Sequence, residues 1–171
     1  KPTIGEITLA KGRQRKTTLA IAGGLEKRSS HPYAIAVLEY LASQNIEPSS
    51  VAGISDIEAG VKGISSSGKE VSFIRADLAK KHNIEVSDKI EQAIAQSSQK
   101  GHGASILAQE NKAIAVFTFV HDDTRDGSKE LIEKLRARDI TVEIISGDQQ
   151  SSVSAFAKSV GLPEEYALGG L

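Results

Sequence analysis

Polar residues suited to phosphate chemistry follow an apolar segment near the end of the chain. Residues 141–145 predict a β-strand, and Ser146, Gly147 and Asp148 come directly after it, before a predicted helix over residues 151–160. A glycine lets the backbone approach a ligand, and a helix N-terminus attracts anions through its N–H groups and its dipole. A carboxylate such as Asp148 can position Mg²⁺ or a water molecule beside a phosphoryl group. For the isolated motif, an ordinary helix cap in an α/β turn is the favoured interpretation.

A second polar segment lies upstream, between a predicted strand and a predicted helix. Residues 113–120 are apolar, β-branched or aromatic, which predicts a strand, and Asp122 and Arg125 follow it. A helix is expected over residues 127–138, with Asp126 placed to cap its first turn. The apolar positions of this helix are expected to form its buried face: Leu131, Ile132 and Leu135.

A histidine stands at the start of another predicted helix. Residues 29–34 read SSHPYA, and Pro32 suits the first turn of a helix because its missing N–H costs no hydrogen bond there. His31 therefore directly precedes the helix, where the helix dipole disfavours an imidazolium ion. A neutral His31 can simply cap the helix, or it can stack on and hydrogen-bond a nucleotide base.

Composition excludes several classes of function. The chain has 171 residues, 39% of them hydrophobic and 25% charged, which allows one domain of usual size or slightly more. Its net charge of −1 gives no electrostatic case for binding nucleic acid or an anionic membrane. It has no cysteine for disulfides or thiolate metal sites, and no apolar run approaches the length of a transmembrane helix. No metal-site spacing links the remaining histidines, which are interpreted as surface or capping residues: His82, His102 and His121.

Together these segments resemble the P-type cation-transporting ATPases. That family has an Asp-x-x-Lys/Arg hinge, then a helix, a strand and Thr-Gly-Asp-Asn. This chain has Asp122-x-x-Arg125 and, after a helix and a strand, residues 146–149 with the sequence SGDQ. Residues 29–34 are similar to Ser-Glu-His-Pro-Leu-Ala, the signature of the heavy-metal (copper-type) transporting subgroup, with Ser30 in place of the glutamate.

A glycine pattern extends the resemblance. Residues 58–63, EAGVKG, are similar to the family's Gly-x-Gly-Val-x-Gly/Ala, a turn whose missing side chains let a nucleotide lie against the backbone. Glu58 occupies the first glycine position, where a carboxylate repels a phosphate. Arg75 and Ala76 stand where the family has Gly-Asn beside the nucleotide.

The resemblance implies an α+β fold in two parts. Residues 1–121 would form the nucleotide-binding domain, an antiparallel sheet flanked by helices. Residues 122–171 would form part of an α/β, haloacid-dehalogenase-like phosphorylation domain. ATP and Mg²⁺ would be the cofactors. The implied site residues fall into three groups: His31, Pro32, Gly60, Val61 and Gly63 for the nucleotide; Ser146, Gly147 and Asp148 in support of catalysis; Asp122 and Arg125 at the hinge.

The resemblance implies that the catalytic nucleophile lies upstream of residue 1. Residues 1–4, KPTI, resemble the Lys-Pro-Thr-Val segment that follows the family's phosphorylated Asp-Lys-Thr-Gly-Thr motif. The phosphorylatable aspartate is therefore expected outside this chain, which should not hydrolyse ATP by itself. Its partners would be ATP and the membrane and actuator domains of the same transporter. The chain would be a soluble piece at the cytoplasmic face of a membrane.

Two structural and three functional interpretations compete. Pattern alone predicts a βαβ unit from residues 113–145, whereas the neighbouring hairpin strand at residues 104–109 favours an antiparallel sheet, which we adopt. One functional alternative is a phosphatase of the haloacid-dehalogenase type, which needs an Asp-x-Asp motif on an early strand that this chain lacks. The other is a non-catalytic nucleotide-binding or interaction module, which the departures at Ser30, Glu58 and Arg75 would fit.

Overall fold

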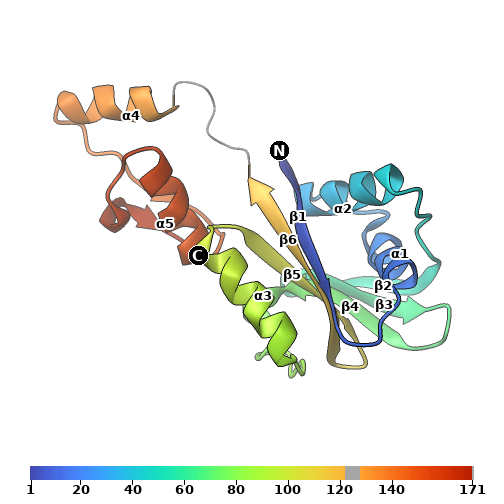
Figure 1. The fold of residues 1–171 in the computed structure, drawn as a ribbon. Helices are drawn as coiled ribbons and strands as arrows, with labels where there is room; N and C mark the ends of the chain where they lie inside the picture. Colours follow the sequence, from blue (N-terminus) through green and yellow to red (C-terminus); the bar gives the residue numbers. More distant parts are fainter. Residues whose placement is uncertain (122–127, 171) are drawn as a thin grey trace.

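A computed structural model describes residues 1–121 and 128–170 of the chain. It consists of a large sheet with helices on both faces and a smaller unit built around α5 (Figure 1). The segment that joins them, residues 122–127, lies outside the described residues, as does Leu171. The predicted hinge residues Asp122 and Arg125 and the predicted cap Asp126 fall in that segment.

The large sheet has six antiparallel strands in the order β1-β6-β5-β4-β3-β2. The longest strand, β6, pairs with β5 on one side and with β1 on the other, which confirms the antiparallel assignment and excludes the βαβ alternative. The strands are β1 (Pro2–Leu9), β2 (Val51–Ile57), β3 (Gly60–Ser65), β4 (Glu70–Arg75), β5 (Gly103–Gln109) and β6 (Lys112–His121).

Tight turns set the register of the hairpins. Glu110 and Asn111 connect β5 to β6 with φ angles of 50° and 62°, as a two-residue hairpin turn requires. Glu58 and Ala59 connect β2 to β3, with φ of 52° at Ala59. Gly60 already pairs with Ile57 across this hairpin. The expected glycine turn is therefore wrong, because the bend is completed before the glycines and these lie within strand β3.

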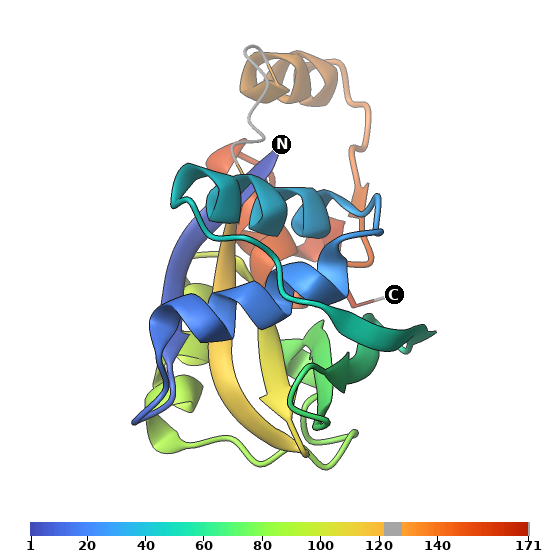
Figure 2. The ribbon, with the colours of Figure 1, turned by 90° about the vertical axis from the view of Figure 1, so that its right-hand side faces the viewer.

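Helices cover both faces of the sheet (Figure 2). On one face, α1 (Arg15–Glu26) and α2 (Pro32–Ser43) pack over a core that includes Phe117 and Phe119. On the other, the short helix η1 (Ala76–Leu78) and α3 (Asp88–Gln99) enclose a second cluster. Because both of its faces are covered, β6 is almost continuously apolar.

The smaller unit holds a two-stranded parallel sheet. Strand β7 (Ile144–Ile145) pairs with β8 (Ala167–Leu168), and α5 (Gln150–Ser159) and η2 (Glu164–Tyr166) lie between them in sequence. The predicted strand over residues 141–145 is thus shortened to its last two residues. Helix α4 (Ser128–Ala137) forms as predicted, but Leu131 on its expected buried face is 58% exposed. That prediction is wrong because only Ile132 of this face packs against the apolar cluster around α5.

The strand register places the candidate site residues at one end of the large sheet. His121 ends β6, Gly103 begins β5, Arg75 ends β4 and Gly60 begins β3. The pairs Gly103–Phe119, Arg75–Ser105 and Gly60–Ile74 align these positions across the sheet. We call this edge the His121 end. Within residues 1–121 and 128–170, no helix is long and apolar enough to cross a membrane.

Candidate functional site

His31 caps helix α2 through its ring. Its Nδ1 accepts a hydrogen bond of 3.1 Å from the backbone N–H of Tyr33, and Pro32 occupies the first helical position as predicted. Since Nδ1 is the acceptor, the neutral ring carries its proton on Nε2. His31 is exposed, so it presents an N–H donor and a ring face to solvent. The capping role and a base-binding role are therefore compatible in one residue.

The glycines of β3 are required by packing. A Cβ on Gly60 would lie 2.3 Å from the carbonyl oxygen of Phe73 on the neighbouring strand. A Cβ on Gly63 would lie 2.6 Å from a methyl group of Val51. Val61 between them is buried in the core beneath α1. The two glycines thus let the neighbouring strands pack closely on β3, and Val61 between them contributes to the core.

The charge of Glu58 is compensated in the structure. Its carboxylate lies 2.9 Å from Lys81 Nζ and 3.8 Å from His82 Nε2. The hydrogen bond from Lys81 is the main cause that lowers the pKa of Glu58, with the nearby positive charges of Lys81, His82 and Arg75 contributing. The carboxylate is fully ionised at neutral pH but is not an isolated negative charge. The repulsion expected from the sequence is therefore reduced by a neighbour that the sequence pattern did not indicate.

The Ser146–Asp148 segment joins β7 to α5 in a loop that is closed by two hydrogen bonds between Ser146 and Asp148. Ser146 Oγ donates to the Asp148 carboxylate at 3.2 Å and accepts from the Asp148 backbone N–H at 3.1 Å. Helix α5 begins at Gln150, directly after this loop. The positive end of the α5 dipole therefore points toward the loop. Asp148 and Gly147 are exposed, so an oxygen ligand and an open backbone face solvent at this helix start.

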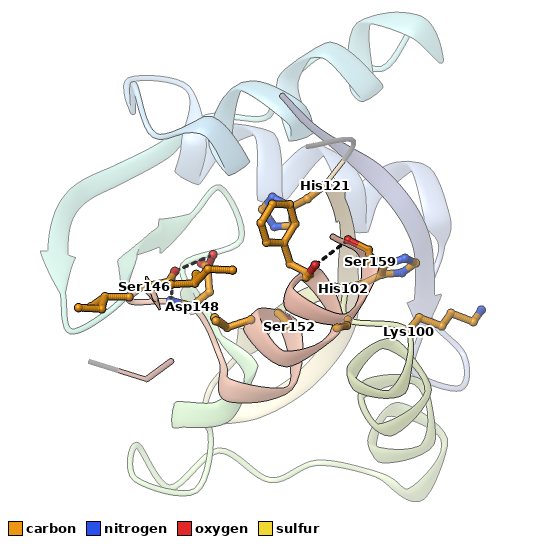
Figure 3. A pocket seen from close by; sticks show the side chains of 13 residues that line it. Lys100, His102, His121, Ser146, Asp148, Ser152 and Ser159 are labelled. Carbon is orange, nitrogen blue, oxygen red and sulfur yellow. Dashed lines mark hydrogen bonds between the residues drawn. The ribbon is translucent and has the colours of Figure 1, made fainter. Parts of the chain in front are cut away.

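A cavity of about 460 Å³ lies between this loop and the His121 end of the sheet. Figure 3 shows Ser146 and Asp148 on one side and His102, Ser159 and Lys100 on the other. Burial, and then the charge of Lys100, lower the pKa of His102. The lining of the cavity also includes His121 and Ser152. The buried hydroxyl of Ser152 has no hydrogen-bond partner among the described residues.

The histidines near this cavity differ from expectation in one contact. His121 was expected at the surface, but its Nε2 lies 2.6 Å from the hydroxyl of Tyr33 on helix α2. His102 and His82 are also half-buried. All three histidines remain partly exposed, as the interpretation as surface or capping residues allows, but it did not foresee the partner of His121. Tyr33 at the start of helix α2 supplies that partner.

Arg75 connects the two parts of the chain. Its Nε donates to Asp77 at 2.6 Å, and its Nη1 donates to the carbonyl of Gly147 at 3.3 Å. A second link is a 2.7 Å hydrogen bond between the hydroxyls of Ser98 and Ser151. Arg75 was interpreted from sequence as a surface charge. In the structure it lies between the end of strand β4 and the Ser146–Asp148 loop.

Glu26 is a buried carboxyl to which the sequence analysis gave no role. It ends helix α1, five residues before His31, and is 7% exposed. Burial, and then the charge of Asp56 on β2, raise its pKa from 4.5 to about 7. Perturbed pKa values of this kind cluster at functional sites, although structural carboxyls show them too. Only the packing of α1 against β2 reveals it, because its sequence neighbours are ordinary.

Comparison with known proteins identifies the family. The family model for haloacid dehalogenase-like hydrolases matches residues 7–168. The chain belongs to the haloacid dehalogenase-like hydrolase family. Its relatives within this family are P-type ATPases: it is 25% identical over 152 residues to a probable copper-transporting P-type ATPase B of Staphylococcus aureus. It is 31% identical over 162 residues to a probable cadmium-transporting ATPase of Alkalihalophilus pseudofirmus.

Solved structures of the same family type share the fold. A catalytic domain of the CPx-ATPase CopB-B superposes with a TM-score of 0.70 at 22% identity, covering 99% of this chain and 55% of that one. The antiparallel sheet flanked by helices, with a haloacid dehalogenase-like part after it, is the predicted fold class, which is confirmed. The match with the Staphylococcus aureus relative covers 88% of this chain but only 22% of the length of that relative.

Proposed function

We propose that this chain is the ATP-binding cytoplasmic part of a heavy-metal cation-transporting P-type ATPase. Its relatives carry names of copper-, zinc- and cadmium-transporting ATPases. The chain would present ATP to a phosphorylatable aspartate of the same transporter that lies outside it. Its partners would be the membrane and actuator domains of that transporter.

The observation that carries this proposal is the arrangement at the His121 end of the sheet. His31 stands there at a helix start and the glycine strand β3 begins there. A cavity of about 460 Å³ at the same end is lined by His121, Ser146 and Asp148. Tyr33 connects His31 to His121 at the rim of this cavity, so a base-binding group and a phosphate-binding loop would lie near one another, as phosphoryl transfer from ATP requires. The enzyme contribution would be positioning and charge neutralisation.

The nucleotide would be held by residues of the large sheet and its helices. The Nε2–H of His31 can donate to the base or the ring can stack on it. The start of β3 would lie beside the ligand, with Pro32 fixing the start of α2. The residues proposed for the nucleotide are His31, Pro32, Gly60, Val61 and Gly63.

The catalytic support would come from the loop after β7. Ser146, Gly147 and Asp148 would face the transferred phosphoryl group, and Asp148 would hold Mg²⁺. A single exposed carboxylate suits this ion, which prefers oxygen ligands and keeps phosphate oxygens and waters around it. Among the described side chains, no three His, Asp or Glu groups gather into a closed metal cage. Bound Mg²⁺ would neutralise charge on the phosphates.

The division into two parts belongs to the same proposal. Residues 1–121 would be the nucleotide-binding domain and residues 122–171 part of the phosphorylation domain, with Asp122 and Arg125 as the hinge. Strand β6 ends at His121, and the solved N-domain of HMA8, a copper-transporting P-type ATPase, covers 70% of this chain with a TM-score of 0.56. Both observations support a boundary after His121.

The test is a calorimetric titration of the chain with ATP, ADP and GTP. We expect saturable, adenine-selective binding that His31→Ala weakens about tenfold, the effect of losing one aromatic contact and one hydrogen bond. Glu39→Ala is the matched control, because Glu39 lies on the same helix and is exposed in a surface ion pair with Lys1. A folded protein that binds no nucleotide at millimolar concentration would refute the proposed site. It would leave the non-catalytic interaction module as the better interpretation.

A further inference from the structure

Tyr33 contacts the ring of His31 through both its backbone and its side chain. Its backbone N–H donates to His31 Nδ1 at 3.1 Å, and the two rings meet edge to face, with centroids 5.4 Å apart and planes at 75°. The first contact fixes which nitrogen of His31 is the acceptor. The second limits how the ring can turn. The orientation of His31 therefore depends on where Tyr33 sits.

The other side of Tyr33 is anchored to strand β6. Its ring stacks on Phe119, with centroids 4.0 Å apart and planes at 1°, and Phe119 is fully buried. Its hydroxyl lies 2.6 Å from Nε2 of His121, the last residue of the strand. A movement of the end of β6 would thus reach Tyr33 through a stacked ring and a short hydrogen bond.

A glycine makes room for this hydroxyl. Gly103 pairs with Phe119 across the sheet, and a Cβ on Gly103 would lie 2.3 Å from Tyr33 Oη. Position 33 is a leucine in the heavy-metal transporter signature that residues 29–34 resemble. A leucine could pack on Phe119, but it has no group to bond His121. The hydroxyl link therefore requires a tyrosine at this position.

We propose that Tyr33 is a positioning residue that couples nucleotide recognition at His31 to the end of strand β6 at His121. The proposal rests on the proposed function, since it gives His31 its ligand. Coupling between two sites is reciprocal, so a nucleotide that orients His31 also changes the surroundings of His121. His121 directly precedes the proposed hinge at Asp122. Occupation of the nucleotide site would in this way be transmitted to the start of the hinge.

The experiment is an ATP titration of the 171-residue chain followed by NMR of its four histidine rings. In the wild type, the His121 signals should move with the same saturation curve as those of His31. Tyr33→Phe keeps the stacked ring and removes only the hydroxyl. It should suppress the response of His121 and weaken ATP binding about fivefold, the effect of one hydrogen bond. Tyr33→Leu should do the same or more.

Tyr40→Phe is the matched control. Tyr40 lies on the same helix, and its hydroxyl accepts a 2.6 Å hydrogen bond from Arg15, so this variant also loses one hydrogen bond from α2. It should leave both the affinity and the His121 response unchanged. ATP binding with no response of His121, or with a response that survives in Tyr33→Phe, would overturn the coupling and leave the proposed function intact. Absence of ATP binding to the wild type would overturn both.

Discussion

Glu26 gives the fold a calculable dependence on pH. The carboxyl is 7% exposed at the end of α1, and burial followed by the charge of Asp56 raises its pKa from 4.5 to about 7. The folded protein therefore keeps this proton up to about pH 7, whereas the unfolded chain releases it near pH 4.5. Between these values the folded state binds more protons than the unfolded state. The contribution of Glu26 to stability is consequently favourable below this window and is lost as the pH rises through it.

The size of the effect follows from the two pKa values. The interval from 4.5 to about 7, at about 1.4 kcal/mol per pH unit, corresponds to about 3 kcal/mol of unfolding free energy. Glu26→Gln has nearly the same shape and no charge. Near pH 8 the variant should therefore be more stable than the wild type by up to about 3 kcal/mol, and near pH 4.5 the two should differ little.

Urea unfolding followed by circular dichroism at pH 5, 6, 7 and 8 measures this difference. Glu39→Gln, which neutralises an exposed carboxylate, controls for general charge effects and should follow the wild type within about 0.5 kcal/mol. If wild type and Glu26→Gln lose stability in parallel from pH 5 to pH 8, the reasoning is refuted.

Asp56→Asn removes the second cause of the raised pKa of Glu26. Without the repulsion from Asp56, the pKa of Glu26 falls back toward 4.5, so the window in which stability is lost ends at a lower pH. The total loss is also smaller, because burial alone then opposes ionisation. At pH 8, Asp56→Asn should therefore be more stable than the wild type and less stable than Glu26→Gln.

Further predictions concern the crowded strand ends and the charge of Glu58. Gly103→Ala should lower the unfolding free energy by about 1–3 kcal/mol, because the added Cβ clashes with the hydroxyl of Tyr33. Adding Tyr33→Phe should recover part of this loss. Thermal unfolding of the single and double variants measures both effects. Gly60→Ala should cost a similar amount with no rescue, because its Cβ meets backbone. Lys81→Ala should weaken ATP binding at low salt, since it removes the cation nearest to Glu58. Calorimetry measures the change, and an unchanged affinity would count against a phosphate near Glu58.

The sequence predicts the large sheet well because its signals are local. The apolar run that becomes β6 and the turn at Glu110 and Asn111 are both visible in the sequence, and they led to the correct choice of an antiparallel sheet. The pattern was less informative where burial depends on distant packing. Leu131 has helical spacing, yet the structure leaves it 58% exposed.

The sequence motifs predicted the positions of individual residues of the candidate site but not the contacts between them. His31 and Pro32 stand at a helix start as expected, because histidine and proline at a helix N-terminus are recognisable locally. The bond between Tyr33 and His121 joins residues 88 positions apart, and no spacing rule indicates it. Glu26 was missed for the same reason, because its burial depends on how α1 meets the sheet.

Two departures from the transporter pattern, at Glu58 and Arg75, make specific contacts in the structure. Glu58 would repel a phosphate if it stood alone, but Lys81 lies 2.9 Å from its carboxylate. Arg75 replaces a small residue beside the expected nucleotide, and it donates to the carbonyl of Gly147 in the phosphate-type loop. A positive side chain that spans the two parts is suited to attract the phosphates of ATP toward that loop. Under the proposed function, these contacts would give the nucleotide site an altered electrostatic potential, which the titrations with ATP and with Lys81→Ala test.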